Sequence, residues 1–193
     1  MEKFEKNLKN KGYTLIELII SLAIGLIIGI GLVSLFLAIY KSFDEIIKRN
    51  KAIASIFNSA EILILDIKKA GYGFNSSSNS SAPFIWDNNT KTLTLKFVDY
   101  TKSGCEDKNW GNYSSCNYEI TYKLENNNIE RIVDEGANGT GAFASMFDEK
   151  IVEVETFEID NSTFPLIKIK MDFKIKTSND TYNFETYVKI PNV

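Results

Sequence analysis

Residues 13–40 read YTLIELIISLAIGLIIGIGLVSLFLAIY. Of these 28 residues, 21 are apolar, and Glu17 is the only one with a side chain charged at neutral pH. The 23 residues of Leu18–Tyr40 contain neither a charge nor a proline. A bilayer core about 30 Å thick is crossed by roughly 20 such residues in a helix, which satisfies its own backbone hydrogen bonds in lipid. The sequence therefore predicts a helix that spans a membrane.

The composition of the whole chain narrows the class of function. Its 193 residues carry a formal net charge of −3 and include no histidine. This excludes Ser-His-Asp and Cys-His catalysis and the common His-bearing metal sites. The slightly acidic balance argues against a general nucleic-acid-binding protein, which usually carries a basic face. We therefore expect no enzyme, no cofactor and no nucleic-acid partner, with a membrane-anchored enzyme as the alternative.

The charges before the span predict its orientation. Four lysines outnumber two glutamates there: Lys3, Lys6, Lys9, Lys11, Glu2 and Glu5. By the positive-inside rule this end stays in the cytoplasm, and residues 41–193 lie outside the cytoplasmic membrane. In that compartment Cys105 and Cys116 can oxidise to a disulfide. The apolar run is too long for a cleaved secretory signal, so an uncleaved signal anchor is the alternative that composition leaves open.

A short motif opens the apolar run. Residues 11–18 read KGYTLIEL, which resembles the type IV pilin class of signal, usually written G-F-T-L-x-E, with Tyr13 in place of the commoner Phe. The motif combines a basic leader, a glycine, an aromatic residue and a glutamate five positions after the glycine. On these residues the chain is identified as a member of the type IV pilin and pseudopilin superfamily.

The resemblance implies how this end of the chain is processed and used. Prepilin peptidase cuts such signals after the glycine, here between Gly12 and Tyr13, and methylates the new amine of Tyr13. Residues 1–12 are then a leader peptide. The resemblance also implies that the Glu17 carboxylate attracts the terminal amine of a neighbouring subunit in a filament. A carboxylate within an apolar span is a functional hypothesis by default; the alternative is that Glu17 lies solvated among the headgroups.

Three glycines lie within the span. Gly25 and Gly29 have the G-x-x-x-G spacing of a close helix–helix contact. Together with Gly31 they also weaken the helix, by up to about 1 kcal/mol each relative to alanine. In pilins the corresponding stretch can melt in the fibre, often at a proline that this chain lacks. The sequence leaves open both a melted and an unbroken helix.

The helix is expected to continue beyond the span. From Phe43, Ile46 and Ile47 onward, apolar residues recur at three- and four-residue steps between charged ones. This spacing indicates an amphipathic helix with one core face, and Gly71 and Gly73 are good terminators. The pattern divides the chain into a leader, a membrane and filament-core half-helix, an amphipathic half-helix, a connecting loop and a head: 1–12, 13–40, 41–73, 74–91 and 92–193.

In the head the hydrophobic period changes to two, which is typical of strands. Six strands are expected, at residues 92–100, 118–125, 129–134, 151–159, 166–176 and 181–190. Polar turn signals at 125–128 and 178–180 predict hairpins. The apolar face of such an antiparallel sheet needs a cover, which the long helix supplies. The sequence therefore predicts an α+β pilin fold.

Two features of the head offer binding sites. The lysines of strand 166–176 could contact DNA; the alternative is a solvated sheet face, offset by Glu153 and Glu155. Asp134, Glu135 and Asn138 offer oxygen ligands to calcium, but their spacing matches no EF-hand. The alternative for these three residues is a bare loop, and we expect no resident metal.

Two segments narrow the resemblance. Residues 66–73, DIKKAGYG, resemble the D-x-x-x-A-G-Y end of the first helix in PilW-type minor pilins, and residues 187–193, YVKIPNV, resemble their closing strand. The resemblance implies a minor pilin that helps to prime assembly, first in the cytoplasmic membrane and then at the pilus tip. It implies as partners other minor and major pilins, prepilin peptidase, the pilus assembly platform and membrane lipid.

Other functions remain open at this stage. The J-type minor pseudopilin of type II secretion is the closest alternative, and the sequence does not separate a pilus, a secretion pseudopilus and a competence filament. A tip adhesin or DNA-uptake subunit is a further alternative. Its specificity would lie in the loops at 75–84 and 101–117.

Overall fold

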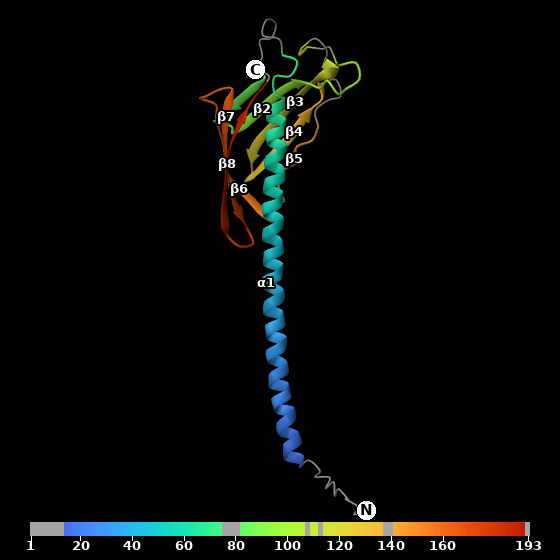
Figure 1. The fold of residues 1–193 in the computed structure, drawn as a ribbon, viewed down its shortest axis with the longest axis vertical. Helices are drawn as coiled ribbons and strands as arrows, with labels where there is room; N and C mark the ends of the chain where they lie inside the picture. Colours follow the sequence, from blue (N-terminus) through green and yellow to red (C-terminus); the bar gives the residue numbers. More distant parts are fainter. Residues whose placement is uncertain (1–13, 75–81, 107–108, 112–113, 137–140, 192–193) are drawn as a thin grey trace, which may run out of the picture. The chain divides into compact units, whose positions relative to one another are not determined.

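The computed structural model describes residues 14–74, 82–106, 109–111, 114–136 and 141–191. In these residues one long helix, α1 (Leu15–Lys69, 55 residues), precedes all the strands (Figure 1). The chain divides into two compact units, and the division falls within α1, between Asp44 and Glu45. Each unit is therefore described separately.

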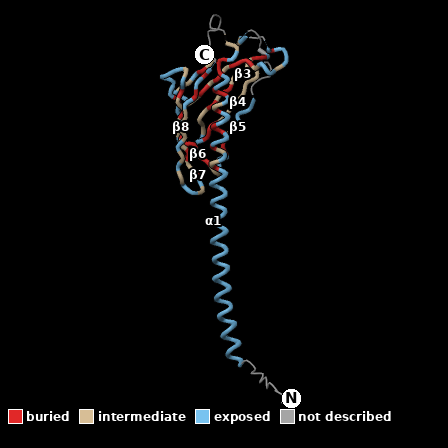
Figure 2. The backbone as a smooth tube through the Cα atoms, in the orientation of Figure 1, coloured by how far each residue is buried: buried red, intermediate tan, exposed pale blue. Residues whose placement is uncertain are grey.

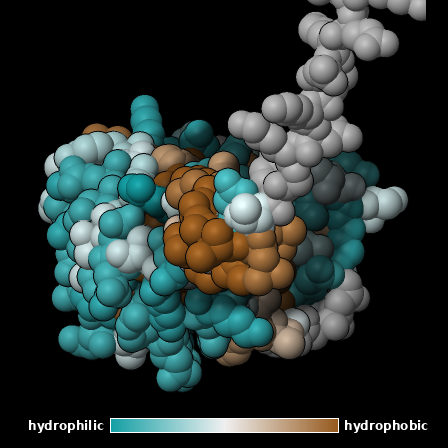
Figure 3. All heavy atoms as spheres, turned by 90° about the horizontal axis from the view of Figure 1, so that it is seen from below, coloured by the Kyte–Doolittle hydropathy of each residue, from teal (hydrophilic) through white to brown (hydrophobic). Residues whose placement is uncertain are grey.

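The first unit contains the amino-terminal half of α1. Its large apolar side chains are exposed throughout, from Leu15 at 80% to Ile39 at 46% (Figure 2). This half-helix is long and apolar enough to cross a membrane. In Figure 3 the brown of apolar side chains gathers on it, whereas the visible surface of the head is mostly teal. Exposing so much apolar surface to water is unfavourable, so this half-helix is stable in lipid or packed against other apolar helices.

The second unit begins with the outer half of α1. Its buried residues follow one another at steps of mostly three or four, which places them on one stripe of the helix: Ala52, Ile56, Ser59, Ala60, Leu63, Asp66 and Ile67. The assignment of Phe43, Ile46 and Ile47 to the core face is wrong. Their exposed fractions are 60%, 51% and 51%, because burial against the head begins only at Ala52.

Five antiparallel strands form one sheet, in the order β1-β2-β3-β4-β5. Residues facing the core alternate along β2, where Leu93, Leu95 and Phe97 are buried. Asn126 and Asn127 have φ angles of 51° and 59° in the tight turn between β3 and β4, as expected of a two-residue hairpin. The strands are β1 (Phe84–Asp87), β2 (Thr92–Val98), β3 (Asn117–Glu125), β4 (Asn128–Asp134) and β5 (Ala144–Ser145), with the 3-10 turn η1 (Ser114–Cys116) before β3.

Three antiparallel strands form a second sheet, in the order β6-β7-β8: β6 (Val152–Asp160), β7 (Leu166–Ile175) and β8 (Asp180–Lys189). The buried residues of β7 are the ones that alternation predicts: Ile167, Ile169, Met171, Phe173 and Ile175. Lysines of the opposite face lie beside carboxylates. Lys168 pairs with Glu185 at 2.8 Å, and Lys174 lies opposite Glu153 in the register.

The α+β arrangement predicted from the sequence is confirmed, but the sheets and strands differ in detail. There are two sheets where one was expected, and β1 lies in the segment expected to be a connecting loop. The sequence of β1, FIWD, does not alternate apolar with polar residues, so it shows no strand period. The sheets meet where the Val154 amide donates to the Asn127 carbonyl at 2.8 Å. One core joins α1 to both sheets.

Candidate functional site

The predicted processing site, Gly12 and Tyr13, lies outside the described residues. The first described residue is Thr14, directly before α1. Cleavage and methylation at these two positions therefore stay predictions from the sequence.

Glu17 lies in the first turn of α1, where it forms a reciprocal cap with Thr14. Its Oε2 accepts hydrogen bonds from the Thr14 amide at 2.9 Å and from the Thr14 hydroxyl at 3.0 Å. In return the Glu17 amide donates to the Thr14 hydroxyl at 3.4 Å. This is the capping box of a T-x-x-E sequence, which satisfies amides that a helix start leaves open. Thr14 was not among the residues predicted from the sequence, although the T-x-x-E spacing was a signal for it.

Gly25 and Gly29 present a surface that nothing in the described chain covers. A Cβ atom built on either glycine, or on Gly31, meets no heavy atom of the described residues within 4 Å. Packing within the subunit therefore does not require these glycines. Their proposed role in contact with another helix stays a prediction, and α1 runs through all three positions without a break.

At the other end of α1, a polar cluster ties the helix to the head; we call Asp66, Lys69, Tyr122 and Arg131 the Asp66 cluster. Asp66 Oδ2 accepts hydrogen bonds from the Tyr122 hydroxyl at 2.6 Å and from Arg131 Nη2 at 2.8 Å. Lys69 Nζ donates to Oδ1 at 3.3 Å. Asp66 is only 3% exposed. A buried carboxylate of this kind is tolerated because its partners supply hydrogen bonds and opposite charge.

The environment of the Asp66 cluster shifts the pKa of both partners on the sheet. Burial, followed by the Asp66 charge, raises the pKa of Tyr122, so this phenol stays protonated and donates. Burial alone would lower the pKa of Arg131, but Tyr122 and Asp66 together raise it. In the sequence, Asp66 is one of the charged residues that occur between the apolar positions of the helix. Its buried role shows only when β3 and β4 bring their side chains to the helix.

The Gly71-Tyr72-Gly73 segment joins the end of α1 to β2. The Gly71 amide donates to the Lys96 carbonyl at 3.0 Å, and the Val98 amide donates to the Tyr72 carbonyl at 2.8 Å. Gly73 has a φ of +76°, and a Cβ there would lie 2.5 Å from Val98 Cγ2. Only glycine fits both the conformation and the space. The D-x-x-x-A-G-Y segment therefore has a structural explanation in this chain.

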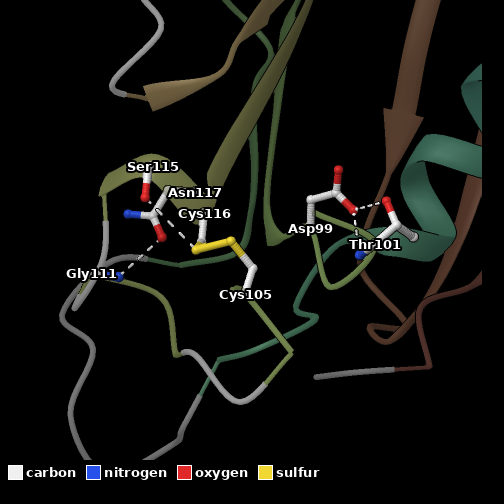
Figure 4. The surroundings of a disulfide bond; sticks show 7 residues. All are labelled: Asp99, Thr101, Cys105, Gly111, Ser115, Cys116 and Asn117. Carbon is white, nitrogen blue, oxygen red and sulfur yellow. Dashed lines mark hydrogen bonds between the residues drawn. A yellow bond between two sulfur atoms is a disulfide. The ribbon is translucent and has the colours of Figure 1, made fainter. Parts of the chain in front are cut away.

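The disulfide expected from the sequence is present (Figure 4). Cys105 and Cys116 are joined by an S–S bond of 2.05 Å, and their exposed fractions are 2% and 3%. They form a small apolar cluster with Val98 and the partly buried Trp110. The Trp110 amide donates to the Gly73 carbonyl at 2.9 Å. The disulfide loop is thereby fixed to the end of α1.

The calcium candidates are only partly described. Asp134 Oδ1 accepts a hydrogen bond from the Gly136 amide at 2.9 Å. Burial, then the carboxylates of Glu135 and Asp99, raise the pKa of Tyr118, and Glu135 also forms a hydrogen bond with it. Asn138 lies outside the described residues. Within the described ranges, no group of three or more Asp, Glu, Cys or His side chains could hold a metal ion.

The chain matches two known families. The family described as Prepilin peptidase-dependent protein B matches residues 49–190, which is nearly three quarters of the chain. The family described as Prokaryotic N-terminal methylation motif matches residues 7–33, which include the second half of the leader, Gly12, Tyr13 and Glu17. No curated protein matches the chain. The sequence from the helix to the closing strand, together with the motif before it, places the chain in the prepilin peptidase-dependent protein B family, as a pilin-like or pseudopilin protein with a methylation motif.

Proposed function

We propose that the chain is a minor type IV pilin that helps to prime pilus assembly at the fibre tip. In this proposal α1 first anchors the subunit in the cytoplasmic membrane, with the head outside the cytoplasm. Prepilin peptidase then cuts between Gly12 and Tyr13 and methylates the amine of Tyr13. The observation that carries the proposal is the exposed apolar half of α1, which begins with a carboxylate whose only cap among the described residues is Thr14.

The role of Glu17 follows from the physics of helix association in lipid. Lipid tails are as apolar as leucine, so apolar contact alone gives helices little reason to leave lipid for one another. A polar contact supplies both the attraction and the axial register. The Thr14 amide and hydroxyl hold the Glu17 carboxylate near the start of α1. A neighbour's terminal amine is a full positive charge and forms the stronger hydrogen bond.

In this proposal, Gly25 and Gly29 form the contact with a neighbouring helix, and the assembly platform moves the resulting complex. The open surface at Gly25 and Gly29 allows a second helix backbone to come close. Other minor pilins would cluster with this subunit through their apolar helices, and the platform would lift the complex while major pilins join beneath. The subunit acts by assembly, and no catalysis is assigned to it.

A minor pseudopilin of type II secretion is the second candidate. The two family matches describe a processed amino-terminal end and a head, and both kinds of protein have these. An adhesin or DNA-uptake role would add a ligand to the same subunit rather than replace the assembly role.

Deleting the gene and restoring it in two forms tests the proposal. The wild-type gene is expected to restore surface fibres, whereas a Gly12→Val variant is expected to stay uncut and to leave the cell without them. Mass spectrometry of the purified chain checks for a methylated Tyr13 amine. A deletion strain with normal fibres but impaired secretion would replace the pilus assignment with the secretion one. A processed Gly12→Val chain would contradict the cleavage site.

A further inference from the structure

A pocket of about 370 Å³ opens in the head between the end of α1 and strands β2, β3 and β4. It lies far along the chain from Glu17 and takes no part in the assembly proposed above. We propose that this pocket, hereafter the aromatic pocket, binds a carboxylate carried on an aromatic or aliphatic body. Volumes of about 300–1,000 Å³ are usual for sites that take small organic groups.

Aromatic rings form much of the wall. Tyr72 and Tyr100 meet edge to face with their ring centroids 6.3 Å apart. Phe97 and Tyr118 are stacked at 5.6 Å. All four residues line the pocket. Paired rings in these geometries form rigid apolar surfaces against which a further ring or an aliphatic group can pack.

Two cations also line the pocket, and one of them has hydrogen-bonding capacity to spare. Arg131 uses Nε and Nη2 to bind Asp66 Oδ2, at 3.0 and 2.8 Å. A guanidinium carries five N–H donors, and within the described residues its Nη1 donates to no partner. The Arg131 side chain is 29% exposed. Asp66 therefore occupies one edge of the guanidinium and leaves the Nη1 end for a second carboxylate.

The second cation is Lys69, whose side chain is 51% exposed. Among the described residues its Nζ makes one ion pair, with Asp66 at 3.3 Å, and it lies 5.7 Å from the centroid of the Phe97 ring. An ammonium group has three donors. It can therefore bind an anion in the pocket without leaving Asp66.

The acidic groups at the pocket are already engaged by the protein. Asp99 Oδ1 accepts hydrogen bonds from the Thr101 amide at 2.9 Å and the Thr101 hydroxyl at 2.6 Å (Figure 4). The Asp66 side chain is 4% exposed and is shared by two cations. Asp66 and the Oδ1 atom of Asp99 are engaged, and Glu135, which forms a hydrogen bond with Tyr118, does not line the pocket. Because Arg131 and Lys69 retain donors, their end of the pocket favours an anion over a cation.

A third cation next to the pocket adds to this preference. Lys102 Nζ lies 5.6 Å from the centroid of the Tyr118 ring. This atom is buried, and no hydrogen-bond partner for it occurs in the described part of the chain. An ammonium group buried without a partner is costly. An anion bound near Tyr118 would lower that cost.

The chemistry fits two sources: a small organic acid, or an acidic side chain next to an aromatic residue in a peptide. We propose to test both on the full chain in micelles of a non-ionic detergent. The small probe is 4-fluorophenylacetate, followed by ¹⁹F NMR, with 4-fluorophenylacetamide as its neutral match and empty micelles as the blank. The peptide probe is a capped Phe-Glu dipeptide, which competes with the fluorinated acid.

Three variants locate the site. Lys69→Gln removes one cation, Tyr100→Ala removes part of the wall, and Lys68→Gln is the matched control. Lys68 is the neighbouring lysine on α1 and does not line the pocket. We expect the acid to bind about tenfold more tightly than the amide, as for a hydrogen bond to a charged group. Lys69→Gln should remove most of this difference, Tyr100→Ala should weaken both probes, and Lys68→Gln should change neither.

Equal binding of acid and amide would overturn the proposal, as would an equal effect of Lys68→Gln and Lys69→Gln. Absence of binding up to about 10 mM would also overturn it, because a fragment of this size in a real site binds more tightly. Tighter binding of the dipeptide than of the free acid supports a protein source for the carboxylate, and the reverse order supports a small acid. Thermal unfolding of each variant checks that the head remains folded.

Discussion

The amino-terminal half of α1 exposes nearly all of its apolar side chains, whereas the outer half buries a stripe of them against the head. Each half also contains one carboxylate among apolar residues. Asp66, in the outer half, is hydrogen-bonded by Tyr122, Arg131 and Lys69 of its own chain. For Glu17, in the other half, the described residues supply only the Thr14 cap.

This difference separates two uses of a carboxylate in an apolar setting. A group whose partners are all in its own chain stabilises the fold of that chain. A group with a cap but no cation in its own described chain is available to a cation from elsewhere. We therefore expect different outcomes when the two carboxylates or their partners are changed. Changes at Glu17 should impair assembly, and changes at Asp66 should lower the stability of the head.

The largest effect is expected from Glu17→Ala. Without the carboxylate a neighbour's amine finds no partner in the packed helices, and incorporation into fibres should fall by about a hundredfold or more. Insertion into the membrane and the melting temperature of the head should not change. Sheared fibres and membranes, blotted separately, measure the two pools. Glu61→Ala, at an exposed position on the same helix, is the control, and normal incorporation of Glu17→Ala would refute the assembly role.

Arg131→Met tests the opposite case. The variant removes the ion pair between Arg131 and the buried Asp66 carboxylate. We expect the free energy of unfolding of the head to fall by about 3 kcal/mol. Chemical denaturation followed by Trp fluorescence measures this. Arg49→Met is the matched control, because the pair of Arg49 with Asp180 is largely exposed and is worth less than about 1 kcal/mol. Equal losses in the two variants would show that the Asp66 cluster does not stabilise the head.

Removing the disulfide should act on the head alone. A closed loop of this length constrains the unfolded chain by about 2.5–3 kcal/mol, so the Cys105→Ser, Cys116→Ser double variant should unfold at a lower denaturant concentration. Treating the wild type with a reducing agent should give the same shift. Retention in the membrane should be unaffected, and a loss of it would show that the two halves of the subunit are not independent.

The smallest effect is expected from Thr14→Ala. Loss of a helix cap costs about 1 kcal/mol, and the Glu17 carboxylate would keep only its hydrogen bond from the backbone amide of residue 14. Incorporation should fall several-fold, well short of the Glu17→Ala loss. Thr14→Ser retains the hydroxyl and should behave as the wild type. If Thr14→Ala and Thr14→Ser are equally impaired, the hydroxyl is not the group that matters.

Much of this architecture could be predicted from the sequence, because its determinants are local. The 23-residue uncharged run specifies the first half of α1, and alternation specifies β7, where each predicted core residue is buried. The cap at Thr14 was also readable, since both of its members lie within four residues. Gly71 and Gly73 ended the helix as expected, although their contacts with β2 could not be seen.

What could not be predicted depends on contacts between distant parts of the chain. Asp66 lies on the buried stripe, between Leu63 and Ile67, and a carboxylate buried there is stable only with a hydrogen-bonded or charged partner. That partner, Arg131, is 65 residues away, and only the folded sheet shows which of the chain's cations it is. The aromatic pocket was missed for the same reason, because its lining comes from α1 and three strands.

The disulfide also affects how freely the sequence of this protein can change in evolution. Cys105 and Cys116 close the connection between β2 and β3 near its base, with Val98 and Trp110 packed against them. The residues between the two cysteines then form a ring whose ends are held together whatever its sequence or length. Substitutions and insertions within such a ring leave the pairing of β2 with β3 intact, and adding residues to a closed loop costs little. Trp110 is the exception, because its ring packs against the disulfide and its amide donates to the Gly73 carbonyl. Other positions of the ring can therefore diversify at little cost to the fold.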